Sequence, residues 1–429
     1  MGFRFTTRAG HPTFVDLPWE QPLGEWDVER MVAPIRGISR HVVRFVAYGP
    51  DVYALKELPD SLAQREYRLL RELDERLVSV VEAVGVASGR TAGDGEPLDD
   101  VLITHHLQYS LPYRSLFGQA SLADLWDSLL DALAELLARA HLAGFFWGDC
   151  SLSNTLFRRD AGALAAWLVD AETGELHDRL SDGQRAHDIE IAEMNVAGEL
   201  LDIRAAAADR GQATGLADDD PRLDPAAVAE DLRRRYDGLW HELTTVEVFG
   251  AGEEWRVDER VRRLNDLGFD VDELELVDDP ADPEGHVLRL TTRVVEPGHH
   301  RRRLLQLTGL DVQENQARRL LNDILAHRAW LERKGGVPVS EQVAALRWMV
   351  DVFEPALSAV PAELRAKLED AELFHQILEH RWFLSEERGE DVGTDVAAAD
   401  YLATVLPEVP DERTVLAPPV TEEVPVVRE

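Results

Sequence analysis

Three polar side chains in the middle of the chain have the types and spacing that the handling of a phosphate group requires. Asp149 and Asn154 lie five positions apart in the segment Trp147–Phe157, and Asp170 ends an apolar run that follows. Phosphoryl transfer needs one carboxylate near the attacking hydroxyl and hard oxygen ligands for Mg²⁺. We therefore expect these residues to surround the phosphates of a Mg-nucleotide, although a polar turn capped by Asp and Asn has the same composition.

A lysine earlier in the chain adds a positive charge that suits phosphates. Lys56 ends the run Val52–Lys56, which predicts a strand, and Glu66 lies in a helix predicted over residues 61–77. The chain has only three lysines among its 45 basic residues, so a lysine at this strand end is more informative than usual. The alternatives are a solvated Lys56 and a Glu66 that pairs with neighbouring arginines on the surface.

Hydrophobic patterning predicts the elements that must hold these residues. Short β-branched and apolar runs predict strands, and apolar residues at three- and four-residue spacing predict helices. The strands expected in the first half are 38–46, 52–56, 78–86, 101–107, 155–157 and 165–169. The helices expected there are 61–77, 122–143, 186–206 and 225–243, with a loop at 207–224. This order puts the Asp and Asn of the polar loop between a helix and a strand.

Within this frame, the segment Gly148–Asn154, of the form Gly-Asp-x-x-x-x-Asn, resembles the protein-kinase-like superfamily. The form is closest to the aminoglycoside phosphotransferase, lipopolysaccharide kinase and RIO-type branches. The resemblance implies an α+β class with a bilobal kinase-like fold over residues 30–245. A small β-rich lobe would occupy about 30–107 and a larger helical lobe about 108–245. The cofactors that the resemblance implies are ATP and Mg²⁺.

The same resemblance gives each polar residue a role. Asp149 would be the catalytic base, while Asn154 and Asp170 would hold the metal. Lys56 would pair with Glu66 and meet the nucleotide phosphates. All five side chains would then line one nucleotide site.

The phosphate-covering loop departs from the usual kinase pattern. The chain has no Gly-x-Gly-x-x-Gly motif in this region, and Gly37 stands alone among bulkier residues. Cover for the phosphates would then come from the backbone at Gly37, from Ser39 or from Arg40. These residues are therefore expected at the nucleotide.

Further positions follow or modify the family pattern. Trp147 stands where the related branches usually have histidine, and Glu172 follows Asp170 in place of the glycine of Asp-Phe-Gly, where it would assist the metal. Asp188 is the candidate for the aspartate that braces the catalytic loop. The segment Leu102–Leu107 would be the hinge beside adenine.

The second half predicts a mainly helical accessory domain over residues 246–408, followed by a disordered tail at 409–429. The segments Gly336–Ser340 and His380–Glu386 resemble bacterial proteins that join such a lobe to a C-terminal domain of unknown function 4032. The helices expected here are 253–267, 311–333, 339–357, 361–387 and 394–405, with a strand pair at 274–277 and 286–295.

Charge and composition narrow the possible partners. The formal net charge of -36 disfavours binding to nucleic acid, because such a surface repels phosphate backbones. No apolar run is long enough to span a bilayer, and the single cysteine, Cys150, fits a reducing cytoplasm. We expect a cytoplasmic protein without a membrane span.

Two smaller clusters also attract attention. His299–Arg303 is a dense basic run, which is interpreted as a solvated turn balanced by nearby acids, with a phosphorylated ligand as the alternative. His375 and His380 share a predicted helix, where packing is the preferred interpretation and no zinc is expected.

Three functions remain open from the sequence. The preferred one is an ATP- and Mg-dependent phosphotransferase whose acceptor is a protein hydroxyl or a small molecule. The second is a pseudokinase, a nucleotide-binding regulatory or scaffold protein that meets a protein partner through its C-terminal domain. The third is transfer of a nucleotidyl group at the same site. The oligomeric state is open in all three.

Overall fold

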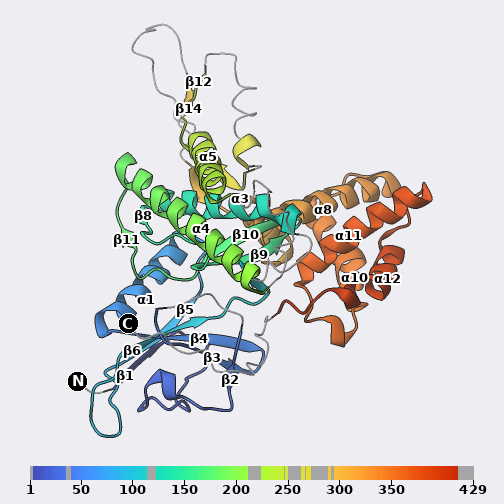
Figure 1. Cartoon of the computed structure of the whole chain (residues 1–429). Coiled ribbons are helices and arrows are strands. Elements are labelled where there is room, and N and C mark those ends of the chain that lie inside the picture. The colour runs from blue at the N-terminus through green and yellow to red at the C-terminus, as the bar shows by residue number, and fades with distance from the viewer. Residues whose placement is uncertain are drawn as a thin grey trace.

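Six antiparallel strands form the sheet of the N-terminal part of this computed structural model, in the order β1-β5-β6-β4-β3-β2 (Figure 1). The structure describes residues 3–34, 40–113, 122–210, 224–245, 247–249, 262–265, 267–271, 288–290 and 294–413. The strands are β1 Arg4–Thr7, β2 Met31–Val32, β3 Val43–Tyr48, β4 Asp51–Leu58, β5 Ala83–Ser88 and β6 Asp100–His105. In this sheet β4 lies between β3 and β6, so Lys56 is held from both sides, opposite Val43 and Leu102.

The two faces of the sheet are covered by different segments. Helix α1, Asp60–Glu75, packs against β5 and β6, and its buried side chains join a core that continues into the next helices. The other face is covered by the segment before β2, where Phe14, Trp19 and Trp26 are buried. Residues 3–30 therefore add a strand and a covering layer before the lobe that the sequence predicts from residue 30.

Helices dominate the next part of the chain. They are α3 Leu122–Leu142, α4 Asp182–Arg210 and α5 Pro225–Thr244, and α3 packs against both α5 and strand β10. The short strands are β7 Ser110–Pro112, β8 Phe145–Phe146, β9 Thr155–Asp160, β10 Ala163–Leu168 and β11 Glu175–Leu176. Strands β7, β9 and β10 form a three-stranded sheet, and β8 pairs with β11. The helices predicted at 122–143, 186–206 and 225–243 are confirmed within four residues at each end.

The β9–β10 hairpin connects the segments on which the sequence places the metal ligands. Its turn, Ala161-Gly162, has φ angles of 54° and 85°, and two positive values are what a type I′ hairpin turn requires. Thr155 lies opposite Leu168, and the Val169 amide donates to Asn154 O at 3.0 Å. The register therefore brings residues 154 and 170 to the same end of the hairpin.

One predicted strand starts later than expected. The apolar run from residue 78 predicts a strand, but β5 begins at Ala83. Val80 and Val81 are buried beside β10, where Val81 N donates to Leu168 O at 3.0 Å and Leu168 N donates to Ser79 O at 2.9 Å. Val80 and Val81 are therefore buried because residues 79–81 pair with β10 of the three-stranded sheet, and they do not extend strand β5 of the six-stranded sheet.

The C-terminal part is built from helices, which Figure 1 shows in orange and red to one side of the rest. They are α7 His299–Thr308, α8 Glu314–Gly335, α9 Glu341–Trp348, α10 Glu354–Ser358, α11 Asp370–Arg388 and α12 Thr394–Thr404. The helix predicted at 339–357 is divided by a π-helical segment, Met349–Phe353, and the one predicted at 361–387 starts later, at Asp370. In the described part of the chain, no helix is both long and apolar enough to cross a membrane.

Four short strands precede these helices. β12 Glu247–Phe249 pairs with β14 Leu288–Leu290, and β13 Phe269–Val271 pairs with β15 Val294–Pro297. Two pairs thus stand where the sequence predicts one, and the strand predicted at 274–277 lies outside the described residues. The α+β class is confirmed, with a β-rich first lobe, a helical second lobe and a mainly helical C-terminal part.

The turn of the β9–β10 hairpin is embedded in the C-terminal part. The buried Asp160 carboxylate accepts from Asn315 N at 3.1 Å and Gln316 N at 2.7 Å, at the start of α8. Glu372 of α11 accepts from Ala161 N at 3.0 Å. The accessory part therefore contacts the same hairpin that carries the predicted metal ligands.

The first residues of the predicted tail also lie at this junction. Glu412 accepts from Arg159 Nε at 2.9 Å, and its amide donates to Lys367 O at 3.1 Å. Tyr109 N donates to Arg413 O at 3.0 Å, close to the end of β6. Residues 409–413 are thus hydrogen-bonded, and residues 414–429 lie outside the described part of the chain.

Candidate functional site

A cavity of about 420 Å³ lies where the six-stranded sheet meets the β9–β10 hairpin and α4. Apolar side chains from the strands line part of it: Val43, Phe45, Ala54, Leu102 and Leu156. Five of the seven predicted site residues line it as well: Lys56, Glu66, Asp149, Asn154 and Asp170. The other two, Gly37 and Ser39, lie outside the described residues. One cavity thus brings together side chains that are more than a hundred positions apart.

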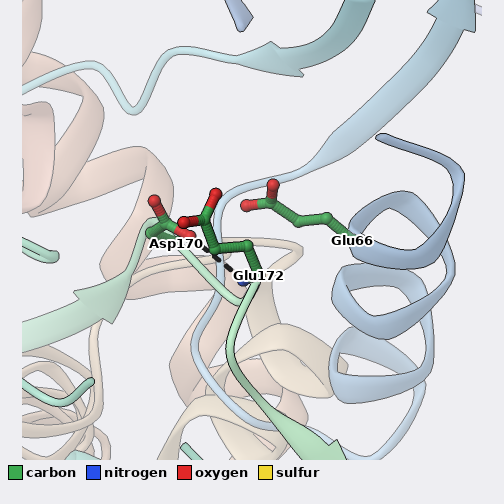
Figure 2. Close-up of side chains that lie close together, drawn as sticks. All are labelled: Glu66, Asp170 and Glu172. Carbon is green, nitrogen blue, oxygen red and sulfur yellow. Dashed lines mark hydrogen bonds between the residues drawn. The ribbon is translucent and has the colours of Figure 1, made fainter. Parts of the chain in front are cut away.

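Lys56 lies among three carboxylates. Its Nζ donates to Asp170 Oδ2 at 2.6 Å, to Glu172 Oε2 at 3.0 Å and to Glu66 Oε2 at 3.2 Å. Figure 2 shows Glu66 reaching from α1 toward Asp170 and Glu172, which come from the segment after β10. The Lys56–Glu66 pair expected from the sequence is therefore present, and two further carboxylates share the same ammonium group.

Negative charge is in excess around this lysine. Burial lowers the pKa of Lys56, but the charges of Glu66, Asp170 and Glu172 outweigh burial and raise it above its ordinary value. Burial raises the pKa of Glu66, and the charge of Asp170 raises it further, against the opposing effect of Lys56. One ammonium cannot neutralise three carboxylates, so the cluster favours an additional cation.

The donor set of the cluster fits a hard divalent cation. One oxygen from each of Glu66, Asp170 and Glu172 lies within 4.8 Å of the others. Carboxylate oxygens are the ligands that Mg²⁺ prefers. Asn154 uses its side-chain nitrogen in hydrogen bonds to Asp149, which leaves the amide oxygen as its potential ligand atom. These residues could hold a metal ion between them.

The Asp149 carboxylate is fixed by donors from several segments. Asn154 Nδ2 donates to Asp149 Oδ2 at 3.1 Å and to Asp149 O at 3.0 Å. Arg40, just before β3, also donates to Oδ2 at 3.1 Å and lies 3.8 Å from Glu172. His41 contacts Glu172 at 3.0 Å. The segment that was expected to cover phosphates therefore does reach this cavity, through Arg40 and His41.

The loop that carries Asp149 is braced by a buried aspartate. Asp188 of α4 accepts from Trp147 N at 2.7 Å and from Gly148 N at 2.8 Å, and it lies 3.0 Å from His141 Nε2. The position predicted for Asp188 is thus confirmed. Since Asp188 holds two consecutive amides, it sets the direction in which Asp149 leaves the loop.

Trp147 makes a connection that the histidine pattern did not suggest. Its indole Nε1 donates to Asp170 O at 3.0 Å, and its backbone carbonyl accepts from Thr173 Oγ1 at 2.9 Å. The ring is fully buried. Trp147 therefore ties the loop of Asp149 directly to the segment that holds Asp170 and Glu172.

Two cavity residues on α4 were missed by the sequence reasoning. Asn195 Nδ2 donates to Asp149 Oδ1 at 3.1 Å, and Glu199 accepts from Leu152 N at 2.7 Å and Ser153 N at 2.8 Å. A signal was present, because residues 188, 195 and 199 fall on one face of a helix and all three are polar. This polar face of α4 therefore contacts the loop that carries Asp149 along its length, from Trp147 to Ser153.

The other side of the cavity carries the predicted hinge. Thr104, His105 and His106 line it, and His106 N donates to Val52 O at 2.8 Å. Burial, with a smaller effect of His105, lowers the pKa of His106 to about 4, so this imidazole is neutral at ordinary pH. A hydrogen bond to Glu82 raises the pKa of His105.

The two smaller clusters found in the sequence lie outside this cavity. The basic run at 299–303 lies at the start of helix α7 and does not form the turn that the sequence predicts. Glu314 accepts hydrogen bonds from two of the first amides of this helix, those of His300 at 2.9 Å and Arg301 at 3.1 Å. Arg301 also pairs with Asp311 at 2.5 Å, so nearby acids balance the run as expected. His380 lies 2.7 Å from Asp400.

Comparison with known protein families gives one match in each half of the chain. Residues 47–209 match the model of the lipopolysaccharide kinase (Kdo/WaaP) family. Residues 238–406 match the domain of unknown function DUF4032. The resemblance to the lipopolysaccharide kinase branch of the kinase-like superfamily, joined to domain 4032, is thereby confirmed, and the first match contains Lys56, Asp149 and Asp170.

Comparison with individual proteins adds little. A search of curated proteins found no match. Among solved structures, the chain is similar to one described as WaaP in complex with acyl carrier protein, at 16% identity and a TM-score of 0.34. That similarity covers 55% of this chain and 99% of the WaaP chain.

Proposed function

We propose that this protein is an ATP- and Mg-dependent phosphotransferase. The observation that carries the proposal is the convergence of Lys56, Asp149, Asn154 and Asp170 on one cavity, in a segment that matches the lipopolysaccharide kinase family model. Apolar strand residues beside the hinge suit a flat base, and the charged residues suit phosphates and a metal. The nucleotide is the first partner, and a protein hydroxyl or a small molecule is the acceptor.

Each residue has a task in this proposal. Asp170 and Asn154 hold Mg²⁺, and Glu172 lies close enough to assist. The metal would neutralise charge on the phosphates as they react. Lys56 exchanges its carboxylate partners in part for phosphate oxygens, while Glu66 keeps it oriented. Asp149 takes the proton from the attacking hydroxyl.

A pseudokinase is the second candidate, and one contact favours it. Arg40 donates to Asp149 Oδ2 at 3.1 Å, so one oxygen of the proposed base is already engaged by a cation. The Arg40 side chain is largely exposed, however, and its release requires no unpacking of the core. In the pseudokinase case the cavity binds nucleotide, and the C-terminal helices meet a protein partner.

Product masses distinguish these possibilities. The full-length protein is incubated with Mg-ATP and cell extract, and the products are identified by mass spectrometry, with Asp149→Asn as the control. We expect an acceptor that gains one phosphate, together with ADP, and only with the wild type. An acceptor that gains AMP would indicate nucleotidyl transfer. No modified acceptor and no ADP, from folded protein that binds Mg-ATP, would favour the pseudokinase.

A further inference from the structure

Asn195 contacts the proposed base from the side of α4. Its Nδ2 donates to Asp149 Oδ1 at 3.1 Å and to Cys150 O at 3.1 Å. Asn195 also lines the cavity, whereas its neighbours Ala192 and Val196 are buried in the core. The amide is therefore held in place by its helix on one side and by the loop backbone on the other.

The donors to Asp149 are unequally divided between its two oxygens. Oδ2 accepts from Asn154 Nδ2 and from Arg40, each at 3.1 Å. In the described part of the chain, the hydrogen bond to Oδ1 comes from Asn195. An ionised carboxylate has about two acceptor positions on each oxygen. While Arg40 is in place, Oδ2 therefore has two donors and Oδ1 has one, so Oδ1 keeps an acceptor position for a further donor.

We propose that Asn195 is a positioning residue for phosphoryl transfer, and that it selects Asp149 Oδ1 as the atom that accepts the acceptor's proton. The inference rests on the proposed phosphotransferase function. The acceptor oxygen forms a bond to the γ-phosphorus of ATP, and the bond from that phosphorus to its bridging oxygen breaks, with the electron pair leaving on ADP. The hydroxyl proton moves to Asp149 Oδ1 and is then released to solvent.

The amide matters because it restricts rotation of the carboxylate. Asn154 and Asn195 hold the two oxygens from opposite elements, the loop before β9 and helix α4. Without Asn195 the carboxylate could turn and present either oxygen, so fewer complexes would have the base correctly aligned. The role assigned to Asn195 acts on Asp149 and not on the nucleotide, so the affinity for ATP should be preserved.

Two substitutions test the proposal in the full-length protein. Asn195→Ala removes the donor, and Asn195→Asp keeps the shape but adds a negative charge. Met194→Ala, at the neighbouring exposed position, is the control. ADP formation from Mg-ATP is measured with water or the identified acceptor, over a range of ATP concentrations, so that kcat and KM are obtained separately, and melting temperatures report folding.

We expect kcat to fall about ten- to a hundredfold in Asn195→Ala, the range for one hydrogen bond to a charged group, with little change in KM for ATP. Asn195→Asp also lacks the amide donor, so it should lower kcat at least as far, again with little change in KM for ATP.

The outcomes separate this inference from the proposed function. If the wild type forms ADP and both Asn195 variants keep its kcat, the role of Asn195 is refuted and the phosphotransferase stands. A fall in kcat accompanied by a comparable rise in KM for ATP would also refute it, because that is what general loosening of the loop would give. If the wild type forms no ADP, the proposed function fails and this inference fails with it. Should Asn195→Ala not fold, the isosteric Asn195→Asp decides.

Discussion

Replacing Lys56 by methionine removes the ammonium that three carboxylates share, while it keeps a side chain of similar length. In the wild type, Nζ lies 2.6, 3.0 and 3.2 Å from oxygens of Asp170, Glu172 and Glu66. The lysine side chain is only 13% exposed, and that of Glu66 is 1% exposed. The substitution therefore leaves the buried Glu66 and the partly buried Asp170 and Glu172 facing one another without the ammonium group that lies among them.

The cost of this change can be estimated, and it depends on pH. Removing one partner of a buried ion pair costs about 3–5 kcal/mol. Because the pKa of Glu66 is raised in the folded protein above its ordinary value of 4.5, the stability linked to it is present below that pH and is lost as the pH rises. Loss of Lys56 raises this pKa further. The pKa of Glu66 is about 8 in the wild type. We therefore expect the variant to be less stable by about 3–5 kcal/mol near neutral pH, and the difference to increase as the pH rises above about 8.

Urea denaturation of wild type and Lys56→Met at several pH values measures the effect, with exposed Lys334→Met as the control. Mg²⁺ should restore part of the lost stability, since one oxygen from each carboxylate lies within 4.8 Å of the others. A difference in unfolding free energy that stays constant from about pH 7 to about pH 9 would refute the reasoning, as would a Lys56→Met protein as stable as the wild type at about pH 8.

Other substitutions test separate contacts. Lys56→Arg should leave the melting temperature nearly unchanged but reduce activity sharply, because a planar fork replaces a compact ammonium. Trp147→Phe leaves Asp170 O without its indole donor, so unfolding free energy should fall by about 1–3 kcal/mol, whereas Trp382→Phe on the surface should have no effect. Asp160→Ala should cost about 2–3 kcal/mol and reduce activity, because it detaches the β9–β10 hairpin from α8; unchanged protease sensitivity would argue against this.

Local patterns in the sequence predicted much of this site. Spacing and residue type were sufficient for Asp149, Asn154 and Asp170, because a hairpin of this length must return the chain to its starting point. Lys56 was found from the predicted strand 52–56, although β4 continues past it to Leu58, so the lysine is not at the end of the strand. The helices of the C-terminal part were found from their periodicity, although the sequence did not show the π-helical segment at Met349–Phe353.

Long-range contacts could not be predicted in this way. Glu172 reaches Lys56 only because the fold brings β4 against the segment after β10. Trp147 donates to Asp170 O because the loop after β8 lies beside that same segment. Asn195 has a local signal, because it lies on one face of α4 with Asp188 and Glu199, but its partner lies 46 positions away. The embedding of Asp160 in the start of α8 depends on how two separately predicted parts pack together, which periodicity does not specify.

Binding of Mg-ATP to the full-length protein, followed by thermal unfolding, tests the central claim most directly. Wild type should be stabilised by ATP with Mg²⁺ and much less by ATP alone; at a hundred times the dissociation constant the gain is about 2.7 kcal/mol. Asp170→Asn should lose the Mg-dependent part, because it removes a metal ligand, while Asp149→Asn should keep it. Folded wild type that shows no shift at millimolar Mg-ATP, or an Asp170→Asn protein that shifts as the wild type does, would contradict a Mg-nucleotide site in this cavity.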